Sequence, residues 1–111
     1  LTSNKEDIEI INSIISDEKK HNLLLRNLYF ELTNKKLPEN REEKNVDNML
    51  NYRRNLKKAL MGELDAVKRY RKIMAAMPDE NKYAVVMEIL TDEIRHANLY
   101  NYLIAKSMQM L

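Results

Sequence analysis

Three stretches of this chain, each about 30 residues long, carry apolar residues in alternating steps of three and four. This spacing puts the apolar side chains on one side of an α-helix and is typical of the seam of a helical bundle. Each seam is interrupted near its middle by a glutamate. The seams comprise Ile8, Ile11, Ile15, Glu18, Asn22, Leu25, Tyr29 and Leu32; Leu56, Leu60, Glu63, Val67, Tyr70, Met74 and Met77; and Tyr83, Val86, Leu90, Glu93, Ala97, Tyr100 and Ile104.

Start and stop signals divide the chain into three helices and one connection. Ser3 and Glu6 have the spacing of a capping box, which predicts a first helix over residues 3–33. We expect the second helix over residues 47–77, where Pro78 ends it, and the third over residues 79–107. The polar residues 34–46 form a surface connection. One Gly and two Pro in 111 residues agree with a single all-α domain.

The first helix is repeated in the third. A shift of 75 positions places Asp17 on Asp92 and Glu18 on Glu93, and it also superposes the only two histidines, His21 and His96. An Asp-Glu-x-x-His motif therefore occurs twice, on helices that are equivalent by this shift. The repeat indicates a molecule built from two similar halves.

The repeat also predicts a further helix. The third helix is preceded by one that carries Glu63, and we expect an equivalent fourth helix upstream of Leu1, with its own seam carboxylate. A helix of this length spans roughly 45 Å, and the connection over residues 34–46 can reach about 43–47 Å when extended. The first two helices can therefore run parallel. A bundle with one long crossover has the ferritin-like topology.

The seam glutamates predict a metal site. Glu and His three residues apart lie on one helical face, so Glu18 with His21, and Glu93 with His96, can each grip one metal. Buried carboxylates are costly when uncompensated, and no Lys or Arg occupies the central seam positions. Two divalent cations would neutralise Glu63, these two glutamates and the carboxylate expected upstream. The ligand set suits iron or manganese, with zinc as a further option.

Four neighbouring side chains have two interpretations each. Tyr70 and Tyr100 follow a seam glutamate by seven residues, which favours core packing with a satisfied hydroxyl or, alternatively, a hydrogen bond to a metal ligand. Asp17 and Asp92 either orient the histidine of the opposite half or are solvated. The sequence leaves both questions open.

These motifs resemble the ferritin-like superfamily and, within it, the small rubrerythrin-type proteins. The resemblance rests on GELDAVKRYRKI at residues 62–73, LTDEIRHANLYNYL at residues 90–103 and SDEKKHNLLLRNLYFEL at residues 16–32. It implies that Glu63 and Glu93 are bridging or terminal ligands and that His96 is a terminal ligand. Glu18 and His21 would be the counterparts in the other half.

The resemblance also implies an activity at a di-iron centre, either as a peroxidase that reduces hydrogen peroxide or as a ferroxidase that oxidises ferrous iron. Rubrerythrins receive electrons through an iron–sulfur domain. This chain has no cysteine, so an enzyme of this kind would need an external electron donor. The absence of cysteine also fits a cytoplasmic protein.

Two alternatives remain: a metal-binding or storage protein without turnover, and a helical interaction module with a degenerate site. Three helices of a four-helix bundle would expose an apolar groove, so we expect a homo-oligomer, most simply a dimer. The net charge of +2 and the short basic clusters argue against a nucleic-acid partner. No apolar run reaches membrane-spanning length.

Overall fold

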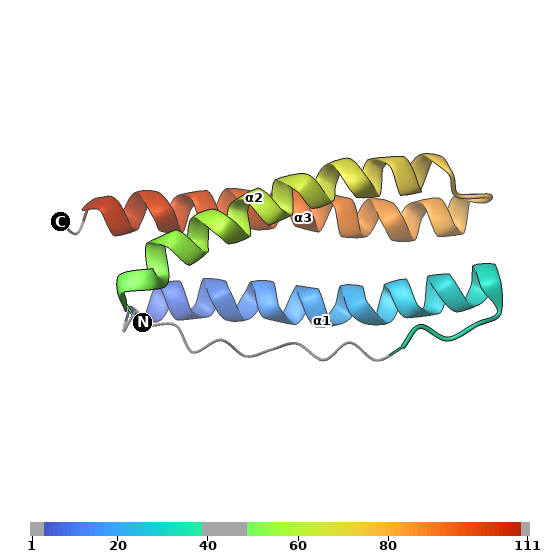
Figure 1. Ribbon diagram of the computed structural model, residues 1–111, viewed down its shortest axis with the longest axis horizontal. Helices are drawn as coiled ribbons and strands as arrows, with labels where there is room; N and C mark the ends of the chain where they lie inside the picture. Colours follow the sequence, from blue (N-terminus) through green and yellow to red (C-terminus); the bar gives the residue numbers. More distant parts are fainter. Residues whose placement is uncertain (1–3, 39–48, 110–111) are drawn as a thin grey trace.

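The structure is a computed structural model that describes residues 4–38 and 49–109, and these form three long helices. Helix α1 spans Lys5–Thr33, α2 spans Met49–Ala75 and α3 spans Glu80–Gln109 (Figure 1). Over the described residues there is no strand, so the all-α prediction is confirmed. The helix ends lie within two residues of those predicted, and residues 47 and 48 are outside the described part. None of these helices is long and apolar enough to cross a membrane.

The first helix is capped at both ends by asparagine. Asn4 is the N-cap, and its Oδ1 accepts hydrogen bonds from the backbone N–H groups of Glu6 at 2.9 Å and Asp7 at 3.3 Å. The N-cap is therefore Asn4 rather than Ser3, the first residue of the predicted capping box, which lies outside the described residues. Asn is an equally good N-cap. At the other end Asn34 adopts the left-handed conformation, with φ of 57°, and its N–H donates to the carbonyl of Phe30.

The connection after α1 is described only over residues 34–38, and the rest of the predicted crossover lies outside the described residues. The directions of the helices nevertheless show how the connection joins them. Helices α1 and α2 run in the same direction and α3 runs in the opposite one (Figure 1). This is the arrangement that the length of residues 34–46 predicted.

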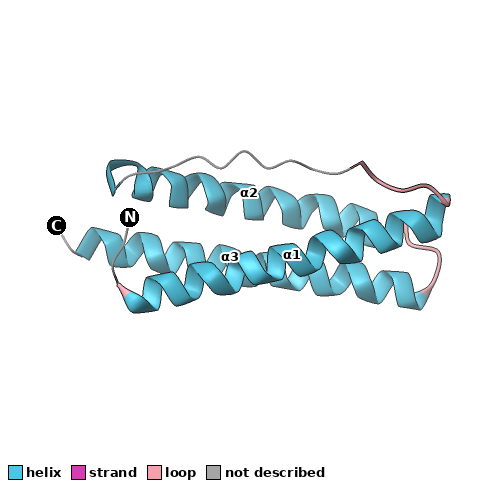
Figure 2. Cartoon of the chain, turned by 90° about the horizontal axis from the view of Figure 1, so that it is seen from below, coloured by secondary structure: helices cyan, strands magenta, loops and turns pink. Residues whose placement is uncertain are grey.

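Helices α2 and α3 pack closely, whereas α1 lies to one side of the pair (Figure 1, Figure 2). The core is a cluster of Leu56, Leu103 and Ile104, with half-buried side chains such as Leu60 and Tyr100 packed around it. Helix α1 packs along α3, but no Cα atom of α1 comes within 8 Å of a Cα atom of α2. A groove therefore separates α1 from α2, with α3 beneath it.

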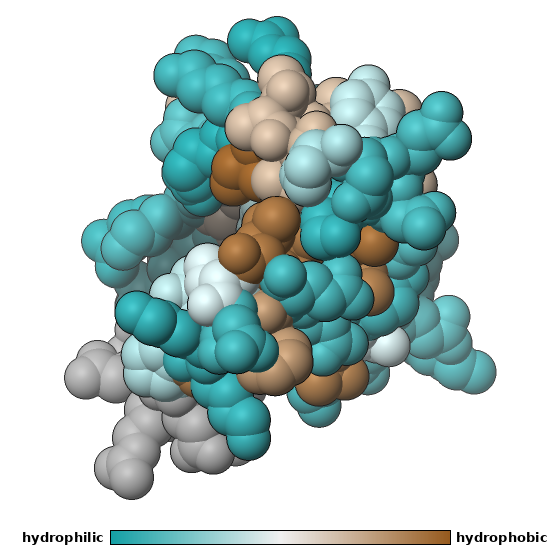
Figure 3. Space-filling model, turned by 90° about the vertical axis from the view of Figure 1, so that its right-hand side faces the viewer, coloured by the Kyte–Doolittle hydropathy of each residue, from teal (hydrophilic) through white to brown (hydrophobic). Residues whose placement is uncertain are grey.

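The predicted seam of α1 is not its buried face. The buried residues of α1 are Asp7, Ile14, His21 and Leu28, whereas Ile8, Ile15, Tyr29 and Leu32 are exposed. The reason is that the backbone of α1 approaches only that of α3, on the flank that holds His21, so most of its seam faces the groove. In α3 most of the predicted seam is buried: Val86, Glu93, Ala97 and Ile104. Hydrophobic side chains consequently reach the surface among hydrophilic ones, brown against teal in Figure 3.

Candidate metal centre

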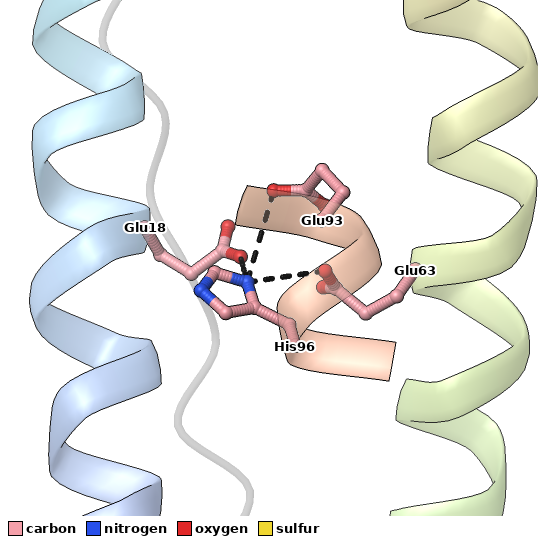
Figure 4. Close-up of side chains that lie close together, drawn as sticks. All are labelled: Glu18, Glu63, Glu93 and His96. Carbon is pink, nitrogen blue, oxygen red and sulfur yellow. Dashed lines mark hydrogen bonds and ion pairs between the residues drawn. The ribbon is translucent and has the colours of Figure 1, made fainter. Parts of the chain in front are cut away.

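All three helices contribute a carboxylate to one cluster. Glu18 comes from α1, Glu63 from α2 and Glu93 from α3, which also supplies His96 (Figure 4). Each of the four offers one ligand atom, and these atoms all lie within 4.8 Å of one another. The three glutamates that interrupt the seams therefore meet at one place.

His96 stands at the centre of this cluster and is completely buried. Its Nδ1 lies 3.3 Å from Oε1 of Glu18, 3.2 Å from Oε2 of Glu63 and 3.8 Å from Oε1 of Glu93. The other ring nitrogen, Nε2, lies 2.8 Å from Oδ2 of Asp17. One nitrogen thus faces the three glutamates, while the other is held by an aspartate outside the cluster.

His21 has the same surroundings in the other half of the repeat. It is buried, with Nε2 at 2.7 Å from Oδ2 of Asp92 and Nδ1 at 3.1 Å from Oε1 of Glu93. That Nδ1 has no partner with hydrogen-bond geometry. The rings of His21 and His96 are stacked, with centroids 5.9 Å apart. His21 is not one of the four residues above, but it adjoins them through Glu93.

The aspartates therefore bind the histidine of the opposite helix, which decides between the two interpretations of the sequence. Each aspartate also faces a basic residue of that helix: Arg95 lies 3.5 Å from Asp17, and Lys20 lies 3.9 Å from Asp92. Sequence reasoning missed these two basic residues. The shift of 75 positions superposes Lys20 on Arg95 and would have paired them.

Glu63 and Glu93, the two most buried carboxylates of the cluster, differ in charge. Burial raises the pKa of Glu93 far above its usual range, and the neighbouring carboxylates Glu63 and Glu18 raise it further. Burial alone would also raise the pKa of Glu63, but hydrogen bonds with His96 and Glu93 outweigh it and lower that pKa. Near neutral pH Glu93 is therefore protonated and shares its proton with the Glu63 carboxylate.

His96 carries a second proton. Burial by itself would lower the pKa of this imidazole, but hydrogen bonds with Glu18, Glu63 and Asp17 prevail and raise it to about 10. Protons on Glu93 and His96 therefore balance much of the negative charge of the cluster. A divalent cation could take the place of both protons.

Neither tyrosine forms a hydrogen bond to a cluster carboxylate within the described residues. Tyr100 packs against the hydrophobic core, as the first interpretation had it. Burial, together with the three glutamates, raises its pKa to about 12. Burial and the charges of Glu93 and Glu18 likewise raise the pKa of Tyr70. Both hydroxyls are therefore protonated near neutral pH, and both side chains line the groove.

The groove between α1 and α2 opens onto the cluster and has a volume of about 930 Å³. Arg26 borders it and donates to the carbonyls of Leu37 and Pro38, both at 3.0 Å. These bonds hold the start of the connection against the groove, a contact that the sequence did not reveal. The groove is lined by Ile14, Ile15, Glu18, Lys19, His21, Asn22, Leu25, Arg26, Leu37, Pro38, Gly62, Glu63, Ala66, Arg69, Tyr70, Glu93 and Tyr100.

The donor set fits a divalent transition metal. Carboxylates and imidazoles are ligands that iron, manganese and zinc accept. Metal-bound histidines generally give their second ring nitrogen to a carboxylate or carbonyl, as both histidines do here. The Nδ1 of His21 is buried, has no hydrogen-bond partner and lies 3.1 Å from Oε1 of Glu93. Comparison with protein-family models, with curated proteins and with solved structures finds no match to this chain.

Proposed function

We propose that this chain is a ferritin-like di-metal carboxylate protein, a rubrerythrin-like oxidoreductase that acts on peroxide, oxygen or ferrous iron. Iron is the first choice for the two metal ions, with manganese or zinc as alternatives. The observation that carries the proposal is the convergence of Glu18, Glu63 and Glu93, from three helices, around the buried His96.

The protein's own groups support this proposal in two ways. Asp17 and Asp92 hold the Nε2 atoms of the histidines, which leaves each Nδ1 turned toward the glutamates. In the single chain, the groove gives a small oxidant a path from solvent to the cluster. Bound metal ions would supply redox equivalents and a Lewis acid at this place.

Metal content tests the proposal directly. We expect about two iron or manganese ions per chain after anaerobic loading and desalting, measured by mass spectrometry. Glu63→Ala and Glu93→Ala should each lose most of this metal. Glu88→Ala is the matched control, because Glu88 is an exposed carboxylate of α3 that pairs with Lys20 outside the cluster. Wild-type chain that remains empty after loading would refute the di-metal site.

Turnover distinguishes the oxidoreductase from the alternatives. The loaded chain, supplied with a chemical reductant, should consume hydrogen peroxide, and the two Ala variants of the cluster should not. Metal without peroxide or ferrous-iron turnover would favour a binding or storage protein. A folded chain that binds no metal and is unaffected by chelator would favour an interaction module.

A further inference from the structure

One face of α1 lacks the neighbour that its repeat equivalent has. The shift of 75 positions places Ile15 on Leu90 and Tyr29 on Ile104. On α3, Leu90 is half-buried and Ile104 is 8% exposed, since α2 packs there. On α1, Ile15 is 46% and Tyr29 36% exposed. Helix α1 thus carries a helix-binding face that no helix in the described residues covers.

The opposite wall of the groove has an unexplained glycine. Gly62, the only glycine of the chain, sits inside α2, and a Cβ atom built there meets nothing within 4 Å. Glycine weakens a helix and is usual where another backbone comes close. Ala59 and Ala66 flank it on the same side of α2 by their spacing, and Gly62 and Ala66 line the groove. Ala66 is 5% exposed and Ala59 is half-buried, whereas Gly62 is exposed, so the uncovered part of this surface is centred on Gly62.

Helix α1 also exposes the large side chains that such a surface would accept. Leu23 is 65% and Phe30 46% exposed, and their spacing of seven residues puts both on one side of the helix. That side adjoins the one with Ile8 and Ile15. Helix α1 therefore presents apolar residues over a broad arc that includes both sides.

We infer that a second copy of this chain fills the groove. In this arrangement α1 of each copy packs antiparallel against α1 of the other along Ile8, Ile15 and Tyr29. Leu23 and Phe30 of each copy then pack onto α2 around Gly62, next to Ala59, in the other copy. The contact is two-fold symmetric, so it closes as a dimer.

Direction and charge both favour this occupant. Helices α1 and α2 run in the same direction, and a two-fold-related α1 enters between them antiparallel to both, as the up-down packing of a bundle requires. Lys19, which lines the groove, has no ion-pair partner among the described residues. In the dimer it approaches a groove floored by Glu18, Glu63 and Glu93 of the other copy.

Oligomeric state tests the inference on the intact chain. We expect light scattering after size exclusion to give twice the monomer mass of 13.2 kDa. Ile15→Lys and Gly62→Leu should each give the monomer mass. Because nothing lies within 4 Å of a Cβ at Gly62, Gly62→Leu should keep the helical circular-dichroism signal and melting temperature, so loss of the dimer would not reflect misfolding.

The matched control is Ile94→Lys. Ile94 is 43% exposed on α3, close to the 46% of Ile15, and does not line the groove, so this variant should remain a dimer. Wild-type chain that is monomeric at every soluble concentration would overturn the inference, and so would a dimer that survives both groove variants. The interface does not depend on metal. A chain that stays empty after metal loading but still dimerises would refute the proposed function and leave the interface standing.

Discussion

His96 of α3 lies with its Nε2 2.8 Å from Oδ2 of Asp17 on α1, and His21 of α1 repeats this contact with Asp92 of α3 at 2.7 Å. Each helix therefore holds the histidine of the other. This reciprocity links the orientation of both imidazoles to the pairing of α1 with α3, so the proposed metal site should depend on both aspartates.

Replacing either aspartate should weaken metal binding by a similar factor. In Asp17→Asn or Asp92→Asn the amide no longer supplies a charged acceptor to the histidine Nε2, and we expect a loss of about 10–100-fold in metal affinity. Competition with a chromogenic chelator measures it. Asp65→Asn, at an exposed position of α2, should leave the affinity unchanged. A strong effect in only one of the two variants would contradict the equivalence of the two halves.

Two neutral replacements in the metal-free chain should have unequal effects. Burial and its carboxylate neighbours keep Glu93 protonated by raising its pKa, so Glu93→Gln preserves its shape and charge and should leave stability unchanged or improved. Glu63 is ionised and interacts with His96, so Glu63→Gln should cost about 1–3 kcal/mol. Urea unfolding compares the two. An equal loss in both would mean that both carboxylates are charged.

The stability of the metal-free chain should fall as the pH rises above neutrality. The pKa of His96 is about 10 in the folded chain, above the ordinary value of 6.5. The contribution of His96 to the free energy of unfolding is therefore complete below its pKa in the unfolded chain. It disappears as the pH rises through its pKa in the folded chain. The raised pKa of Glu93 acts with the same sign. The urea concentrations at the midpoint of unfolding, measured at about pH 6, 8 and 10, should decrease in that order.

Metal affinity should change in the opposite direction over the same range. Binding requires deprotonated ligands, so the protons on Glu93 and His96 must leave. Calorimetric titrations in buffers of different ionisation enthalpy would count the protons released. A metal affinity that falls as the pH rises from about 6 to about 8 would show that the metal does not displace these protons.

The far end of the bundle depends on one lysine. Lys106 Nζ lies 2.8 Å from Oδ1 of Asp7 and 2.8 Å from Oε1 of Glu6, and Asp7 is buried. Lys106→Met should lower the melting temperature, because it removes the cation that these two carboxylates share. Lys68→Met, at an exposed position of α2, is the matched control. Equal melting temperatures for the two variants would show that these ion pairs contribute nothing.

Much of this arrangement could be predicted because it follows from local spacing. Periodicity located the helices, and the repeat of Asp17 and His21 in Asp92 and His96 gave the crossed contacts as one of two open interpretations. Which face of α1 is buried could not be predicted in the same way. Several sides of this helix are apolar, and its packing along α3 buried Ile14 and left Ile15 exposed.

Long-range polar contacts were equally beyond reach. Arg26 reaches the carbonyls of residues 37 and 38, and no periodic pattern indicates a side chain that bonds to backbone more than ten residues away. The protonation of Glu93 could not be predicted from the sequence either. Its pKa depends on burial and on two carboxylates from other helices, and both follow from packing rather than from its neighbours in the chain.

The looser attachment of α1 also has a kinetic consequence. Helix α1 carries Glu18 and His21, and its backbone approaches only that of α3, so in a monomer it should detach before α2 and α3 separate. Hydrogen exchange should then be faster for the amides of α1 than for those of the α2–α3 pair. A bound ion would dissociate mainly while α1 is detached. The residence time of the metal would accordingly be set by how often one helix lifts away, rather than by the strength of any single coordination bond.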